Sequence, residues 1–67
     1  MDILLNNIPT KLPDSVMTVA DLAEWKDIRR AGTAIAVNDK IVRKDMWKNA
    51  HLSPLDRVTV ISAAFGG

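Results

Sequence analysis

The run of residues near the C-terminus constrains the fold of this chain more than any other feature. Residues 57–63, RVTVISA, are rich in β-branched side chains, and no turn or helix signal follows them. The run therefore predicts a final strand. Two hairpin patterns come earlier, at residues 2–12 and 33–42, and two antiparallel hairpins do not by themselves account for this last strand. Apolar surface is buried best if the strand lies in the centre of the sheet, parallel to the first strand and between the hairpins.

The first hairpin pattern consists of two apolar runs, residues 2–5 and 8–12, on either side of Asn6-Asn7. Asparagine tolerates positive φ better than most residues, so this pair predicts a tight turn. Pro9 has no N–H to donate to a neighbouring strand, which places the second strand at an edge of the sheet. The alternation of side chains predicts the following inward-facing residues: Ile3, Leu5, Ile8, Thr10 and Leu12.

A helix is predicted between the two hairpins. Thr18 is a good N-cap residue, and Asp21 stands three positions later, where a capping box needs an acceptor. The predicted helix runs from about Val19 to Asp27. Its apolar stripe consists of Val19, Leu22 and Ala23. Trp25 and Ile28 lie off that stripe, so the last turn is expected to pack differently or to unwind.

The second hairpin pattern joins residues 33–37 and 40–42 through a turn at 38–39. Less regular sequence follows, with a short helical turn predicted at 45–47 and another turn at 53–54. The complete order is strand, strand, helix, strand, strand, irregular segment, strand. This order predicts an α+β domain in which one main helix covers a five-stranded mixed sheet, the β-grasp arrangement.

Length and composition exclude several classes of protein. Sixty-seven residues suffice for one domain with a single small core. The absence of cysteine excludes disulfides, thiolate metal sites and a thiol that could carry sulfur. Nine basic and eight acidic residues give a formal charge of +1, which argues against nucleic-acid binding. No apolar run is long enough to cross a membrane and no leader pattern is present, so a cytoplasmic protein is expected.

The sequence contains no pattern of an active site. His51 is the only histidine, whereas a zinc site needs three or four ligands. Three glycines are too few for a phosphate-binding loop of the Walker or dinucleotide type. Asp21, Glu24 and Asp27 recur at helical spacing, which is typical of a solvated helix face. We therefore expect no catalytic residue, no metal site and no enzymatic activity of the chain alone.

The sequence ends in Gly66-Gly67 directly after the predicted last strand. Two glycines have no side chain to anchor them and can enter a narrow channel in a partner. We expect residues 1–63 to form the β-grasp domain and residues 64–67 to form a flexible C-terminal tail in which Phe65, Gly66 and Gly67 project from the domain. An ordinary frayed chain end is the alternative interpretation of two glycines considered alone.

The order of these elements in so short a chain resembles the ubiquitin-like sulfur carriers, and most closely the ThiS family. The resemblance extends over nearly the whole chain. Its best-matching segments are residues 18–22, 34–42 and 55–61, together with Trp47 and Gly66-Gly67. Two departures affect packing: Glu24-Trp25-Lys26 interrupts the leucines of the family's helix, and Asn6-Asn7 stands where the early strands usually have a glycine turn.

The resemblance implies a mechanism centred on the carboxylate of Gly67. An adenylating enzyme would activate that carboxylate with ATP, and a sulfur donor would displace AMP to leave a thiocarboxylate. A thiazole synthase of thiamine biosynthesis would then receive the sulfur. The chain itself would bind no cofactor. A molybdopterin-type sulfur carrier, a ubiquitin-like protein modifier and a non-covalent β-grasp interaction module remain alternatives.

An activating enzyme must hold the domain while the tail enters its active site, so an exposed apolar patch is expected near the last strand. Val58 is expected to face the core. The candidates for the docking surface lie on the opposite face of the sheet: Thr59, Ile61, Ala63 and Leu4. In the alternative arrangement, the irregular segment covers Ile61.

Overall fold

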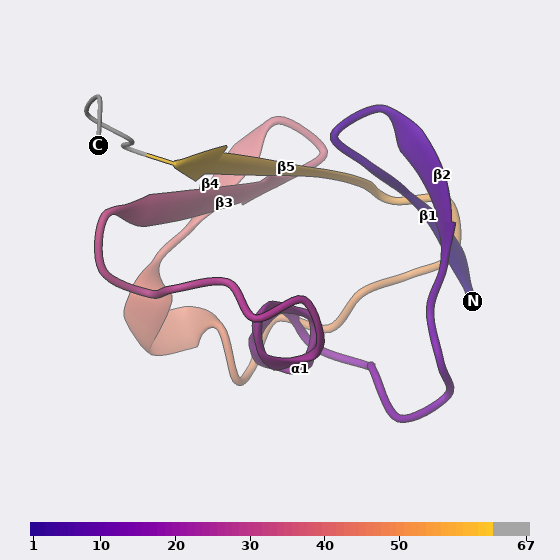
Figure 1. The fold of residues 1–67 in the computed structure, drawn as a ribbon, viewed down its shortest axis with the longest axis horizontal. Helices are drawn as coiled ribbons and strands as arrows, with labels where there is room; N and C mark the ends of the chain where they lie inside the picture. Colours follow the sequence, from indigo (N-terminus) through magenta and orange to yellow (C-terminus); the bar gives the residue numbers. More distant parts are fainter. Residues whose placement is uncertain (63–67) are drawn as a thin grey trace.

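The computed structural model describes residues 1–62 of the chain (Figure 1). These residues form five strands, one α-helix and one 3₁₀-helix. In chain order the elements are β1 (Asp2–Leu5), β2 (Ile8–Lys11), α1 (Val19–Trp25), β3 (Thr33–Val37), β4 (Lys40–Val42), η1 (Lys44–Met46) and β5 (Arg57–Ser62). The predicted tail at 64–67, and with it the boundary of the domain, lies outside the described residues.

The strands form one sheet in the order β2-β1-β5-β3-β4. β5 runs parallel to β1 and antiparallel to β3, so it lies between the two hairpins as predicted. Its pairing with β3 extends from Val37↔Val58 to Thr33↔Ser62. In Figure 1, α1 lies below the sheet and crosses one of its faces. The predicted mixed sheet with one main helix is confirmed.

Both predicted hairpin turns are present. Asn6 and Asn7 have φ values of 50° and 67°, and Asn38 and Asp39 have values of 51° and 71°. Positive φ at both central residues is what a type I′ turn requires, and its twist matches that of the flanking strands. β2 is an edge strand, in agreement with the position of Pro9.

The start of α1 agrees with the prediction. The Asp21 N–H donates to Thr18 Oγ1 at 3.1 Å, and the Thr18 N–H donates to Asp21 Oδ2 at 3.1 Å. These two bonds form the capping box, which satisfies backbone donors that the helix itself leaves unpaired.

The last turn of the predicted helix is unwound, as expected, so α1 is two residues shorter than predicted. The helix ends at Trp25 rather than at Asp27, because Asp27 has a φ of 55° and reverses the chain direction. The Ile28 N–H then donates to the Ala23 carbonyl at 2.7 Å, and the Asp27 N–H donates to the Glu24 carbonyl at 3.1 Å. These bonds form a Schellman motif, in which aspartate takes the position that glycine usually has. Ile28 consequently packs against the core.

The core lies between α1 and one face of the sheet. Its buried residues are Ile3, Leu12, Val16, Val19, Leu22, Ala23, Ile35, Trp47, Leu52 and Val58. Ile8 pairs with Leu5 and so lies on the predicted inward face, but it is 64% exposed. It is the first residue of the edge strand β2, directly after the first hairpin turn, where a side chain has few neighbours. No helix formed by residues 1–62 is long and apolar enough to cross a membrane.

Candidate functional site

The candidate site is the C-terminal end of β5 together with the surface around that strand. Gly67, predicted to carry the chemistry, and the predicted tail residues Phe65 and Gly66 follow β5 in the chain and lie outside the described residues. The described residues show which contacts hold β5 in the sheet and which side chains lie on each face of the sheet beside it.

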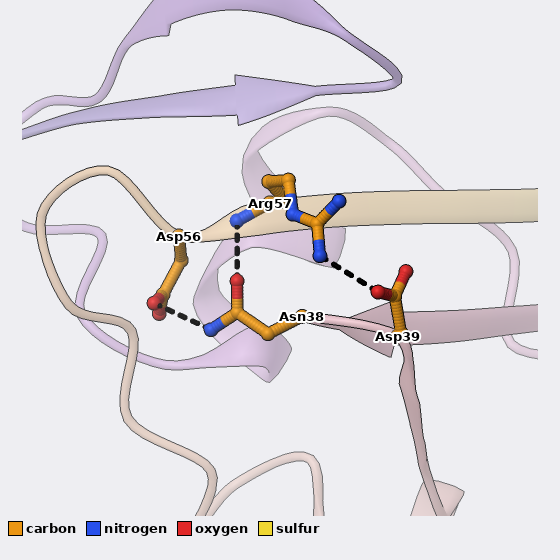
Figure 2. Close-up of polar contacts among 4 residues, drawn as sticks. All are labelled: Asn38, Asp39, Asp56 and Arg57. Carbon is orange, nitrogen blue, oxygen red and sulfur yellow. Dashed lines mark hydrogen bonds and ion pairs between the residues drawn. The ribbon is translucent and has the colours of Figure 1, made fainter.

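The start of β5 is held by the second hairpin turn (Figure 2). The Asn38 amide group donates to Asp56 Oδ1 at 2.9 Å, and its oxygen accepts from the Arg57 N–H at 2.9 Å. The Arg57 guanidinium forms an ion pair with Asp39 at 2.7 Å, with both side chains more than half exposed. The other oxygen of Asp56 accepts from the Ser53 N–H at 2.7 Å. These contacts fix the point at which the central strand enters the sheet.

The first hairpin turn contacts the same strand further along. The Asn6 N–H donates to the Val58 carbonyl at 2.8 Å, and Asn6 Oδ1 accepts from the Val60 N–H at 2.8 Å. The two hairpin turns therefore hold β5 from opposite edges, one near its start and one near its middle.

The faces of β5 agree with the predicted alternation. Val58 is 1% exposed and faces the core, and Val60 is partly buried against it. Thr59 is exposed on the opposite face, and Ile61 there is 49% exposed. The irregular segment therefore does not cover Ile61. Leu4 pairs with Arg57 and lies half-buried on the same face, whereas Ala63 lies outside the described residues.

The apolar surface on this outer face is larger than predicted. Ile41 is 61% exposed and pairs with Ala36, which in turn pairs with Thr59, so all three lie on one face. Ala34 pairs with Ile61 and completes the group. We refer to Ala34, Ala36, Ile41, Thr59 and Ile61 as the outer-face patch, in which Ala36 itself is buried between its neighbours at 7% exposure. The triplet Lys40-Ile41-Val42 shows no clear alternation, because Lys40 and Val42 share one face and differ in polarity, so the sequence did not predict the outward direction of Ile41.

Asp21 belongs to the scaffold of α1. Backbone N–H donation from Met17 and Thr18 holds the pKa of Asp21 below its ordinary value of 3.8, in the capping box of α1. His51 is exposed and pairs with Thr18 in an isolated β-bridge. No group of three or more His, Cys, Asp or Glu residues within 1–62 could hold a metal ion.

A groove of about 460 Å³ lies between α1 and η1. The Arg30 guanidinium lies over the Trp47 ring at 5.7 Å from its centroid, and it donates to the Lys44 carbonyl at 3.2 Å. The rim carries both cationic and anionic side chains, so its charge favours no single class of ligand. The charged lining residues are Arg30, Lys44, Lys48, Glu24 and Asp45.

Comparisons of the chain with protein families, with individual proteins and with solved structures agree with one another. The sequence model of the ThiS family matches residues 3–67. The chain is 34% identical over 50 residues to the sulfur carrier protein ThiS of Escherichia coli, a match that covers 75% of this chain and 76% of that protein. Its fold is similar to the crystal structure of a thiamine biosynthesis protein (ThiS) from Geobacter metallireducens, with a TM-score of 0.84, 16% identity and full coverage of both chains. The structural match concerns the fold alone.

Proposed function

The chain belongs to the ThiS family, and we propose that it is a sulfur carrier of thiamine biosynthesis that holds sulfur as a thiocarboxylate on Gly67. One observation carries this proposal: the family match extends from residue 3 to residue 67 and so includes Gly66-Gly67. The 34% identical relative from Escherichia coli is a sulfur carrier protein by name, which supports the same function. The family assignment makes the chain a carrier and not an enzyme.

The chemistry of a terminal carboxylate explains why the carrier needs a partner. Its unperturbed pKa is about 3.5, so at neutral pH it is ionised and a poor electrophile. On an adenylating enzyme, a carboxylate oxygen would attack the α-phosphorus of ATP, and pyrophosphate would leave. A hydrosulfide-type sulfur would then attack the carbonyl carbon, and AMP would leave with its electron pair. The thiocarboxylate formed is a sulfur nucleophile for a thiazole synthase.

The outer-face patch is our proposal for the surface that binds the adenylating enzyme. Ile41 and Ile61 are 61% and 49% exposed on one face of the sheet, and small alanine side chains lie between them. Such a surface gains free energy when a partner covers it. β5 carries Ile61 and leads directly to the tail, so a partner bound here would also be close to the point where the tail begins.

The tail and the cellular compartment are the two remaining features of the proposed function, and neither is part of the described residues. The tail at 64–67 is proposed to give the reach that an enzyme active site requires, with Gly66 narrow enough to pass and Gly67 as the reacting residue. Action in the cytoplasm remains a prediction from the sequence.

The intact mass of the protein tests the function. Incubation with ATP, the cognate adenylating enzyme and a sulfur donor should raise the mass by about 16 Da, the difference between oxygen and sulfur, and the change should require ATP. A variant that lacks Gly67 is the control and should show no change. Stable amide conjugates with lysine residues of other proteins, formed without any gain of sulfur, would instead identify a ubiquitin-like modifier and refute the proposal.

A further inference from the structure

The two hairpin turns contact the central strand through the same type of residue. The first residue of each turn is an asparagine, Asn6 or Asn38. Its backbone N–H donates to a β5 carbonyl, and its side-chain oxygen accepts a β5 N–H. Asn38 makes both bonds to Arg57, at 2.7 and 2.9 Å. Asn6 makes them to Val58 and Val60, both at 2.8 Å. The φ values of the two asparagines are nearly equal, 51° and 50°.

The Asn6 side chain continues the support of β5 where strand pairing stops. β1 pairs with β5 at Leu4↔Arg57 and Leu5↔Val58, and the chain then turns away at Asn6. The next N–H on this edge of β5 belongs to Val60, and Asn6 Oδ1 accepts it in place of a strand carbonyl. Glycine would tolerate the positive φ of this turn, but it has no side-chain acceptor. Asn6 therefore accepts a hydrogen bond from β5 that a glycine at this position could not accept with a side chain.

We propose that Asn6 is a positioning residue that fixes the direction in which β5 leads into the reactive tail. On the β3 edge, pairing holds the strand as far as Ser62. On the other edge, the bond from Val60 to Asn6 lies nearest to the tail. A strand end held along one edge only can twist and open locally. This inference rests on the proposed function, because a fixed direction matters only if Gly67 must reach an active site while the domain is docked.

Three variants separate this role from the stability of the turn. Asn6→Gly removes the acceptor and keeps a residue suited to positive φ. Asn7→Gly is the matched control, because Asn7 lies in the same turn with a φ of 67° and its side chain makes no hydrogen bond within residues 1–62. Asn6→Asp keeps an acceptor oxygen at the same position and should rescue the effect.

Amide hydrogen exchange of Val60, followed by NMR, tests the contact itself. In Asn6→Gly this amide should exchange at least about fivefold faster than in the wild type, the factor expected for loss of one hydrogen bond. It should remain near the wild-type rate in Asn7→Gly and Asn6→Asp. Equal Val60 exchange in Asn6→Gly and the wild type would overturn the proposal.

Steady-state adenylation tests the consequence. With ATP and the cognate adenylating enzyme, Asn6→Gly should lower kcat about tenfold with an unchanged KM, because small misplacements of a reacting group reduce the rate steeply. Asn6→Asp should restore kcat. An unchanged kcat, or a raised KM alone, would overturn the positioning role while the proposed function stands. If the wild type itself is not adenylated, the proposed function fails and the role of Asn6 fails with it.

Discussion

Replacement of Ile61 tests whether the outer-face patch binds the adenylating enzyme. Complete burial of an isoleucine side chain contributes about 1.5–3 kcal/mol. Ile61 is 49% exposed in the free domain, so about half of this, about 1 kcal/mol, is left to be gained when a partner covers it. Ile61→Ala should therefore raise the KM for the carrier in adenylation about fivefold at unchanged kcat. Ile61→Asp should raise KM more than tenfold, because it also places a carboxylate in the contact.

Ile8 provides the matched control for this experiment. It is 64% exposed and pairs with Leu5, so it lies on the helix-covered face and not on the outer face. Ile8→Asp changes the same side chain to the same charge at another exposed site and should leave KM unchanged. The assay is ATP-dependent pyrophosphate release at increasing carrier concentration, with folding of each variant checked by circular dichroism. The reasoning would be refuted by an unaltered KM in folded Ile61→Asp, or by an equal rise in Ile8→Asp.

Two further predictions concern stability. Val58→Ala should destabilise the domain by about 2–3 kcal/mol in urea unfolding, since it removes two methyl groups from a fully buried site and leaves a cavity. Thr59→Ala, at the exposed neighbouring position on the other face, should change the free energy of unfolding little. Asp21 has a lowered pKa in the folded state, so its contribution to stability is present above its unfolded pKa and lost as the pH falls through the folded value. Asp21→Asn should accordingly have a lower thermal midpoint at pH 7, with the difference from the wild type shrinking at low pH. A constant difference across the pH range would contradict this.

Local signals explain why so much of the fold was predictable. The pairs Asn6-Asn7 and Asn38-Asp39 predict their turns because asparagine and aspartate tolerate positive φ. Thr18 predicts the helix start because its side chain can accept a hydrogen bond from the first turn. The central position of β5 followed from a topological argument, because two hairpins cannot bury a fifth strand in any better place.

The features that the sequence did not predict depend on tertiary contacts. The unwinding of the last turn of α1 was expected, but not its cause: Asp27 takes a left-handed conformation that lets Ile28 reach the core, and the presence of an aspartate does not by itself predict that conformation. The exposure of Ile8 depends on how little of β2 the rest of the domain covers. The bond from Val60 to Asn6 joins residues 54 positions apart, so no local pattern contains it.

The location of the sulfur after the reaction with ATP tests the sulfur-carrier function most directly. Cleavage after Arg57 with trypsin releases residues 58–67 as one peptide, which contains the end of β5 and the whole tail. We predict that this peptide gains about 16 Da only when ATP, the adenylating enzyme and the sulfur donor are all present, and that fragmentation places the gain on Gly67. A gain on any other peptide or residue, or a gain that does not require ATP, would contradict the assignment of this chain as a thiocarboxylate sulfur carrier.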